Sequence, residues 1–327
     1  MSTQPIQGGG SPDVTAAKER IEDLRREVQR IYIGSTKSLD MMMIALLAKG
    51  HVLLEGVPGV AKTTLVKAFA TVLGCSARRI QFTPDLLPAD ITGTYVLSPR
   101  DGTFSLRAGP IFANVVLADE INRAPAKTQS ALLEAMQERQ VTIEGDRFEL
   151  PLPFLVLATQ NPIDLEGTYP LPEAQIDRFL VRVPMGYPSA REEAQMLKTH
   201  GIEPPQLRVL LNPQEIIALQ NLTARLHVDD DLHDYAVAIC SYTRTHPKVA
   251  LGASPRATLG LLNAAKAHAL VHARSYVVPE DIRAVAPTVL AHRLVLIADA
   301  EGDTRIRDSI VEEALQKVGY RRGFRAV

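Results

Sequence analysis

The segment that most constrains the fold is a glycine-containing loop between an apolar run and a helical pattern. Residues 56–64 read Gly-Val-Pro-Gly-Val-Ala-Lys-Thr-Thr and come almost directly after the apolar run His51–Leu54. Gly56 and Gly59 can adopt backbone angles that turn successive N–H groups toward phosphate oxygens. A buried strand followed by such a loop and then by a helix is typical of an α/β protein with a parallel sheet. The segment therefore predicts a fold of this class with a phosphate-binding site.

The end of this loop carries side chains suited to a phosphorylated ligand and its metal ion. Lys62 would place a positive charge beside the outer phosphates, and Thr63 would offer its hydroxyl to Mg²⁺. The helix predicted over residues 62–73 directs its positive end at the same anion. Ala61 stands where the general pattern has glycine, and the alternative interpretation is a Gly-Pro-Gly turn that precedes Lys-Thr by chance. The strand–loop–helix context favours phosphate binding. The predicted nucleotide-binding residues of the loop are Gly56, Val57, Pro58, Gly59, Val60, Ala61, Lys62, Thr63 and Thr64.

Composition narrows the class of protein further. Of the 327 residues 46% are hydrophobic, so a sizeable core can form, yet no apolar run reaches the about 18 residues of a membrane helix. The 36 basic and 37 acidic residues argue against a generally basic surface for nucleic acid. Cys75 and Cys240 lie far apart, which favours a reducing compartment, and we expect a cytoplasmic protein. Residues 1–13 lack the apolar core of a signal peptide and are expected to form a disordered tail.

Apolar runs and helical patterns alternate along the first part of the chain, which indicates a parallel sheet covered on both faces. The predicted strands are His51–Leu54, Arg79–Phe82, Asn114–Ala118, Phe154–Thr159 and Phe179–Val183. The predicted helices include residues 14–30, 38–48, 62–73 and 125–139, the last with Pro125 in its first turn. The expected core is thus a five-stranded parallel sheet with helices on both faces.

Two stretches interrupt this alternation, and the pattern changes after Tyr187. Turn residues between β-rich runs predict β-hairpin inserts at residues 93–109 and 140–150. From Ser189 onward the pattern is mostly helical. We therefore expect a tail at 1–13, an α/β domain at 14–187 and a helical domain at 188–327.

Polar residues follow two of the predicted strands. Asp119 and Glu120 end an apolar strand, where Asp119 suits a metal ion and Glu120 suits a general base that activates water. The alternative is a pair of solvated carboxylates at a strand end, which the phosphate loop upstream disfavours. Asn161 follows another strand and could orient the attacking water if the two strands are neighbours. It could equally be a turn-forming Asn before proline.

Two arginines and two histidines complete the candidate residues. Arg178, before the fifth strand, and Arg256, at a predicted helix start, could stabilise charge on a transferred phosphoryl group. The alternative for each is an ordinary surface ion pair. His268 and His272 have a spacing that suits zinc, but no third ligand is evident, and no metal site is expected there.

These motifs together resemble the MoxR group of the AAA+ ATPases over roughly residues 33–293. The stretches that carry the resemblance are Gly50–Thr63, Asp119–Gln129, Ala158–Pro162 and Gly252–Ala257. The MoxR pattern itself has alanine before the lysine, so Ala61 fits it. The resemblance implies that Asn161 is the sensor-1 residue and that Arg178 is an arginine finger reaching the nucleotide of a neighbouring subunit. It also implies that Arg256 is the sensor-2 residue of a helical lid domain and that Ile33 and Gly34 lie beside the adenine.

The resemblance also implies an activity, cofactors and partners. It implies a homo-oligomer, a hexameric ring with both hairpins facing its pore, which uses ATP and Mg²⁺ to remodel or mature a client protein. A separate partner with a von Willebrand factor A domain is expected, and neither nucleic-acid binding nor membrane insertion is expected. Three alternatives stay open: a motor that translocates on nucleic acid, a metal-chelatase motor subunit, and a nucleotide-gated scaffold with little turnover.

Overall fold

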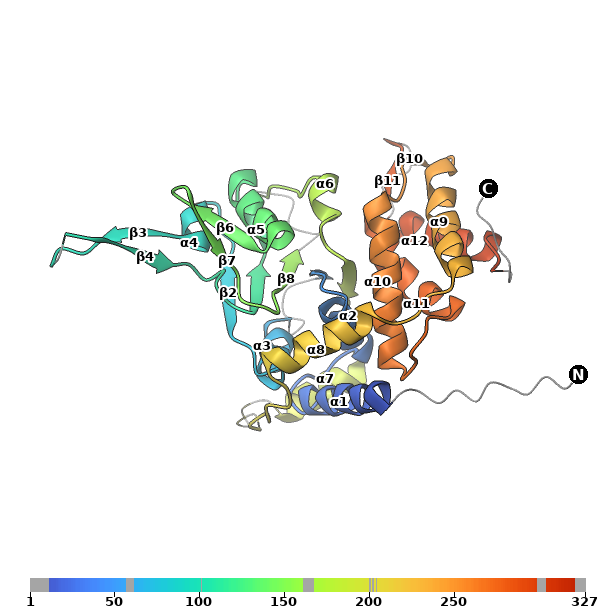
Figure 1. The fold of residues 1–327 in the computed structure, drawn as a ribbon, viewed down its shortest axis with the longest axis horizontal. Helices are drawn as coiled ribbons and strands as arrows, with labels where there is room; N and C mark the ends of the chain where they lie inside the picture. The colour runs from blue at the N-terminus through green and yellow to red at the C-terminus, as the bar shows by residue number, and fades with distance from the viewer. Residues whose placement is uncertain are drawn as a thin grey trace, which may run out of the picture. The chain divides into compact units, whose positions relative to one another are not determined.

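The computed structural model describes residues 12–56, 62–100, 102–160, 168–199, 201, 203, 205–298 and 304–320 (Figure 1). The predicted loop residues Val57–Ala61, Asn161 and nearly all of the predicted tail lie outside the described residues. The chain forms two compact units, Leu24–Ala218 and Leu219–Val327, the latter joined by residues up to Asp23. The sequence predicts a domain boundary after Tyr187. That boundary does not coincide with this division into compact units and stays a prediction.

A five-stranded parallel sheet forms the centre of the unit Leu24–Ala218, as the sequence predicts. Its strands are β1 (Val52–Gly56), β2 (Ala77–Gln81), β5 (Val115–Asp119), β8 (Leu155–Gln160) and β9 (Val181–Met185). They lie in the order β2-β5-β8-β1-β9, and every neighbouring pair is parallel. The carboxyl ends of β1, β5 and β8 therefore meet at one edge of the sheet. The predicted phosphate loop begins at this edge, and Asp119 and Glu120, the acidic pair, lie there too.

Helices cover both faces of this sheet. In this unit they are α2 (Thr36–Leu47), α3 (Lys62–Val72), α4 (Pro88–Thr92), α5 (Ala126–Glu138), α6 (Glu173–Ile176) and α7 (Ala190–Thr199). Alternate strand residues such as Leu53 and Val116 pack with Ile91 of α4 and Leu132 of α5 in one core cluster. The helix α3 contacts β2 and β5 on the other face (Figure 1). Pro125 is the residue before α5 rather than part of its first turn, because its ψ of 154° is extended.

A buried histidine ties the amino end of β1 to its neighbours. His51 is 5% exposed, and its Nε2 lies 3.0 Å from the carbonyl oxygen of Met136 at the end of α5. Its Nδ1 accepts a hydrogen bond of 3.0 Å from the backbone N–H of Val156 in β8. Burial lowers the pKa of His51 to about 4. The ring is therefore neutral at pH 7, with the proton on Nε2 directed at the carbonyl oxygen.

Both predicted hairpins are present. One consists of β3 (Gly93–Leu97) and β4 (Phe104–Ala108), and the other of β6 (Gln140–Ile143) and β7 (Asp146–Glu149). The β3–β4 hairpin projects away from the sheet of its unit (Figure 1). The Tyr95 hydroxyl of β3 donates a hydrogen bond of 2.6 Å to Asp146 Oδ2 of β7. This bond links the two hairpins.

The second unit is mostly helical, as the sequence predicts. Its elements are α9 (Asp230–Thr245), β10 (Val249–Leu251), α10 (Pro255–Val271), α11 (Pro279–Leu290), β11 (Val295–Leu296) and α12 (Thr304–Lys317). The helices α1 (Pro12–Val28) and α8 (Pro213–Ala224) each contain residues of both units. His268 Nδ1 lies 2.6 Å from the fully buried Asp281, which also accepts from Arg274. His268 thus has a structural partner, and the described residues contain no cluster of three metal ligands.

None of the described helices is long and apolar enough to cross a membrane.

Candidate active site

The described ends of the phosphate loop lie at the carboxyl edge of the sheet. Gly56 is the last residue of β1, and Lys62 is the first residue of α3. Lys62 Nζ donates a hydrogen bond of 2.7 Å to the carbonyl oxygen of Gly56. Burial lowers the pKa of the Lys62 amine, and the nearby carboxylates of Asp119 and Glu120 act in the opposite direction. Lys62 therefore lies close enough to Asp119 and Glu120 for their charges to act on its amine.

Gly56 is a glycine for a steric reason that the sequence does not reveal. Gly56 and Met185 are paired residues of β1 and β9. A Cβ added at Gly56 would lie 2.2 Å from the carbonyl oxygen of Met185, far inside van der Waals contact. Any larger residue would therefore push β1 away from β9 where the phosphate loop begins. In the first turn of α3, Thr63 is half-buried and Thr64 is exposed.

Asp119 is a buried carboxylate with both oxygens engaged. The residue is 9% exposed at the end of β5. Its Oδ1 accepts a hydrogen bond of 2.6 Å from the hydroxyl of Thr159 on β8. Its Oδ2 accepts from two nitrogens of Arg79 on β2, at 3.0 Å from Nε and 2.6 Å from Nη2. A charge this deeply buried requires such partners, since an unpaired buried carboxylate is strongly unfavourable.

Glu120 adopts a backbone conformation that few non-glycine residues adopt. Its φ of 57° and ψ of 51° are left-handed, and the residue begins the short 3₁₀ turn Ile121–Arg123. Its backbone N–H donates 2.8 Å to the hydroxyl of Thr159, and its Oε2 accepts 2.8 Å from Gln81 Nε2. A salt bridge of 3.3 Å joins the same oxygen to Arg123. Backbone strain of this kind tends to occur at functional sites, where it fixes the direction of a side chain.

Three side chains of this network, Arg79, Gln81 and Thr159, were not identified as site residues from the sequence. Thr159 is fully buried and bridges the pair, because its hydroxyl accepts from Glu120 and donates to Asp119. Gln81 is in register with Asp119 across β2 and β5. Arg79 and Gln81 are two residues apart and so lie on one face of the strand. Gln81 and Thr159 are polar residues at or near the ends of their strands, and Arg79 lies two residues before Gln81; only the strand pairing shows that they meet Asp119 and Glu120.

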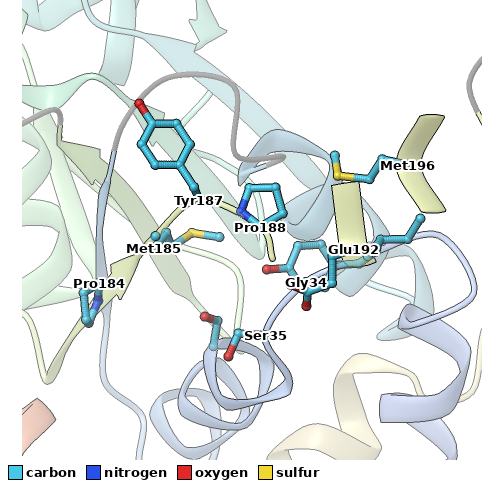
Figure 2. Close-up of a pocket in the computed structure, with 12 residues that line it drawn as sticks. Gly34, Ser35, Pro184, Met185, Tyr187, Pro188, Glu192 and Met196 are labelled. Atoms are coloured by element: carbon cyan, nitrogen blue, oxygen red, sulfur yellow. The ribbon is translucent and has the colours of Figure 1, made fainter. Parts of the chain in front are cut away.

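A pocket lies where the resemblance places the adenine. Its walls include Ile33 and Gly34 before α2, Met185 and Tyr187 at the end of β9, and Met196 of α7 (Figure 2). The full lining is Tyr32, Ile33, Gly34, Ser35, Ser38, Pro184, Met185, Gly186, Tyr187, Pro188, Glu192 and Met196. The backbone and the apolar side chains here offer a planar base hydrogen-bonding edges and stacking surfaces.

Gly34 also lies close to a neighbouring side chain. A Cβ added there would lie 2.5 Å from the hydroxyl oxygen of Tyr32, whose pKa is raised by burial.

The two arginines lie in different units. Arg178 follows α6 and is half-buried, with Nε 3.3 Å from Gln137 Oε1 and Nη1 3.3 Å from the carbonyl oxygen of Ala174. Both of these contacts with described residues are long and made to neutral acceptors. Arg256 is the exposed second residue of α10, a helix whose start is capped by the Ser254 hydroxyl. The roles of both arginines, and that of Asn161, stay predictions.

The chain matches two families of protein domain. Residues 51–181 match the ATPase family associated with various cellular activities (AAA), and residues 241–314 match the AAA lid domain. A crystal structure from Cytophaga hutchinsonii, of a protein with a provisional ATPase designation, matches with a TM-score of 0.88 and 39% identity. That match covers 94% of this chain and 97% of the other. These matches and the parallel sheet define an ATPase of the AAA+ class, which binds nucleotide.

Whole-length relatives narrow this class to one family. Chaperone MoxR1 of Mycobacterium tuberculosis is 49% identical over 319 residues, which cover 95% of this chain and 85% of that protein. The uncharacterized protein YeaC of Bacillus subtilis is 48% identical, over 89% of this chain and 92% of its own. Protein MoxR of Methylorubrum extorquens is 31% identical, over 88% and 91%. The chain belongs to the MoxR family of AAA+ ATPases.

Proposed function

We propose that the protein hydrolyses ATP with Mg²⁺ at the carboxyl edge of its sheet and uses the energy to remodel a client protein. The observation that carries the proposal is the junction of β5 and β8. There one buried hydroxyl, that of Thr159, holds both Asp119 and the strained backbone of Glu120. Lys62 lies close enough for both carboxylates to influence its pKa. This arrangement presents a cation, a metal-binding carboxylate and a base to one phosphorylated ligand.

The residues present fit a magnesium ion. Mg²⁺ prefers oxygen ligands and is usually bound by one or two protein groups together with substrate phosphates. Asp119 and Thr63 would provide a carboxylate and a hydroxyl of this kind. The Asp119 carboxylate already pairs with a cationic group, the Arg79 guanidinium. When bound, Mg²⁺ would neutralise charge on the β- and γ-phosphates.

Side chains of the protein would bind the phosphates, activate the water and hold the adenine. Lys62 would exchange the carbonyl oxygen of Gly56 for phosphate oxygens, and Glu120 would orient a water molecule and accept its proton. Asn161 would help to orient that water, since β8, the strand that precedes it, is a neighbour of β5. Arg256 would act from the lid in the same subunit. The pocket at Ile33 and Gly34 would hold the adenine.

Arg178 would complete the site of a neighbouring subunit, which requires a homo-oligomer, in this proposal a hexameric ring. The chaperone role follows from family membership and from the name of the relative MoxR1. A separate partner with a von Willebrand factor A domain belongs to the same proposal.

The test is ATP turnover measured against protein concentration, with ATP binding measured alongside. We expect Glu120→Gln to bind ATP and lose hydrolysis, while the exposed control Glu134→Gln behaves as the wild type. Turnover per subunit should rise with concentration and should be lost in Arg178→Ala but not in Arg225→Ala, which removes an exposed arginine elsewhere. Wild-type turnover in Glu120→Gln would refute the assigned mechanism.

The same assay tests the shared site and two of the three alternatives. Turnover that does not depend on concentration and that Arg178→Ala leaves unchanged would refute the shared site. Stimulation of turnover by DNA would favour a motor on nucleic acid. Tight ATP binding with negligible turnover would favour a nucleotide-gated scaffold.

A further inference from the structure

We propose that Arg79 is a built-in counter-cation for Asp119, which occupies this carboxylate in the nucleotide-free protein and is displaced by the Mg²⁺ that arrives with the nucleotide. Arg79 would then raise the Mg²⁺ concentration that the site requires. The inference rests on the proposed function, in which Asp119 binds the metal ion. It adds a positioning residue to the site, on a strand that none of the sequence motifs includes.

The hydrogen bonds of Asp119 leave only one oxygen available for exchange. Its Oδ1 accepts from the Thr159 hydroxyl at 2.6 Å, and that hydroxyl also accepts the backbone N–H of Glu120 at 2.8 Å. Thr159 cannot turn away without breaking its hydrogen bond with this half-buried residue, so Oδ1 stays engaged. Among the described residues, the hydrogen-bond partner of Oδ2 is Arg79, at 2.6 Å from Nη2 and 3.0 Å from Nε. A metal ion that reaches the free lone pairs of Oδ2 therefore meets the guanidinium.

The two partners of the salt bridge differ in their freedom to move. The Asp119 side chain is 12% exposed on the interior strand β5, whereas the Arg79 side chain is 48% exposed on the edge strand β2. The Arg79 nitrogen Nη2 also contacts the side-chain oxygen of Gln81, two residues along the same strand. The guanidinium can thus leave Asp119, keep a hydrogen-bond partner and enter solvent. When the salt bridge opens, Arg79 is the partner that moves.

Electrostatics then links the metal ion to the nucleotide. With Arg79 in place the buried Asp119 charge is already paired, and the Lys62 amine contributes a second positive charge nearby. A divalent cation alone would have to displace Arg79 and approach Lys62 without compensation. Mg²⁺ that arrives with phosphates brings negative charge for both basic groups. We therefore expect Mg²⁺ to bind the wild-type protein together with nucleotide rather than before it.

The test is equilibrium binding of a fluorescent, non-hydrolysable ATP analogue as Mg²⁺ is titrated. Arg79→Met should lower the Mg²⁺ midpoint about fivefold, because a half-exposed salt bridge contributes on the order of 1 kcal/mol. Arg79→Lys, which keeps the charge, should retain a midpoint near that of the wild type. Arg78→Met removes an exposed arginine from the opposite face of β2 and should also leave the midpoint unchanged. An unchanged or raised midpoint in Arg79→Met would overturn the inference.

A second measurement covers the case in which Arg79→Met folds poorly. Without nucleotide, Mg²⁺ alone should raise the melting temperature of Arg79→Met and leave that of the wild type unchanged, because only the variant has an unpaired carboxylate. A variant that is merely destabilised would not gain a response to Mg²⁺, and such a result would count against the proposal.

Asp119→Asn separates failure of the inference from failure of the proposed function. If Asp119→Asn abolishes the Mg²⁺ dependence of nucleotide binding and Arg79→Met does not shift it, only the inference fails. If nucleotide binding by the wild type does not respond to Mg²⁺ at all, the proposed metal site fails with it.

Discussion

Mild acid should destabilise the α/β unit through one buried side chain, His51. The ring is neutral in the folded protein, where Nδ1 accepts the Val156 N–H and Nε2 donates to the carbonyl oxygen of Met136. Protonation would place a second N–H against the backbone donor of Val156 and a charge in the core. Burial accordingly lowers the pKa of His51 from 6.5 to about 4. A proton must therefore bind the unfolded chain in preference to the folded one.

The magnitude and the pH window follow from this shift. Between pH 6.5 and 4 the unfolded state binds more protons, so the stability from neutral His51 is present above pH 6.5 and is lost as the pH falls toward 4. The full shift corresponds to about 3 kcal/mol, of which about 2 kcal/mol should be lost by pH 5. Carboxylates with lowered pKa values, such as Glu27 at about 2, titrate below this window.

Urea unfolding at pH 7.5 and pH 5.0 would measure the effect. The chain contains no tryptophan, so circular dichroism is a better probe than intrinsic fluorescence. The wild type should lose about 2 kcal/mol more than His51→Gln between the two pH values, because the variant has no proton to bind there. His233→Gln removes a half-exposed histidine and is the control for loss of a histidine as such. An equal pH dependence in the wild type and His51→Gln would refute the reasoning.

Three further substitutions test other contacts. Glu27 is 1% exposed and hydrogen-bonds Arg208, which holds its pKa at about 2, so Glu27→Gln should lower the melting temperature at pH 7. This contribution is present above about pH 4.5 and fades toward pH 2, so the difference from the wild type should shrink in acid. Gly56→Ala should cost about 1–3 kcal/mol and weaken binding of the ATP analogue, because its Cβ would overlap the Met185 carbonyl. Thr159→Val should reduce kcat about tenfold to a hundredfold with ATP binding retained, because it removes the hydroxyl that hydrogen-bonds both Asp119 and the backbone of Glu120.

Matched controls exist for each of these substitutions. Glu22→Gln changes an exposed carboxylate in the same helix as Glu27. Gly319→Ala adds a Cβ where nothing lies within 4 Å. Thr142→Val changes an exposed threonine on β6. If a control substitution changes the measured stability, binding or kcat as much as its test variant does, the contact named in that prediction is not the cause of the change.

The strands and both hairpins could be predicted because each depends on local pattern. Val115–Ala118, within the predicted strand Asn114–Ala118, is continuously apolar, as is typical of a strand buried on both faces, and the structure has β5 at Val115–Asp119. The phosphate loop stays a prediction, although its residue types and spacing are likewise a property of one segment. The boundary at Pro125 differed by one residue, because a proline can occupy either side of a helix start.

The network around the acidic pair could not be predicted in the same way. Arg79 lies in a run that was interpreted only as a strand, and its partner Asp119 is 40 residues away. Thr159 reads as one more β-branched residue in an apolar strand until the pairing of β5 with β8 sets it beside Asp119. The predicted role of Gly56 is in the loop, and the structure adds a second constraint, the backbone of β9 beside it. Each depends on strand register, which residue spacing within one segment does not determine.

The hydrogen bond between Tyr95 and Asp146 has a mechanical consequence. It fastens the projecting β3–β4 hairpin to the β6–β7 hairpin, which directly follows α5. The other end of α5 begins a few residues after Glu120. A displacement of the β3–β4 hairpin would therefore be transmitted to the β6–β7 hairpin and to the end of α5. We therefore expect the two hairpins to move together rather than independently.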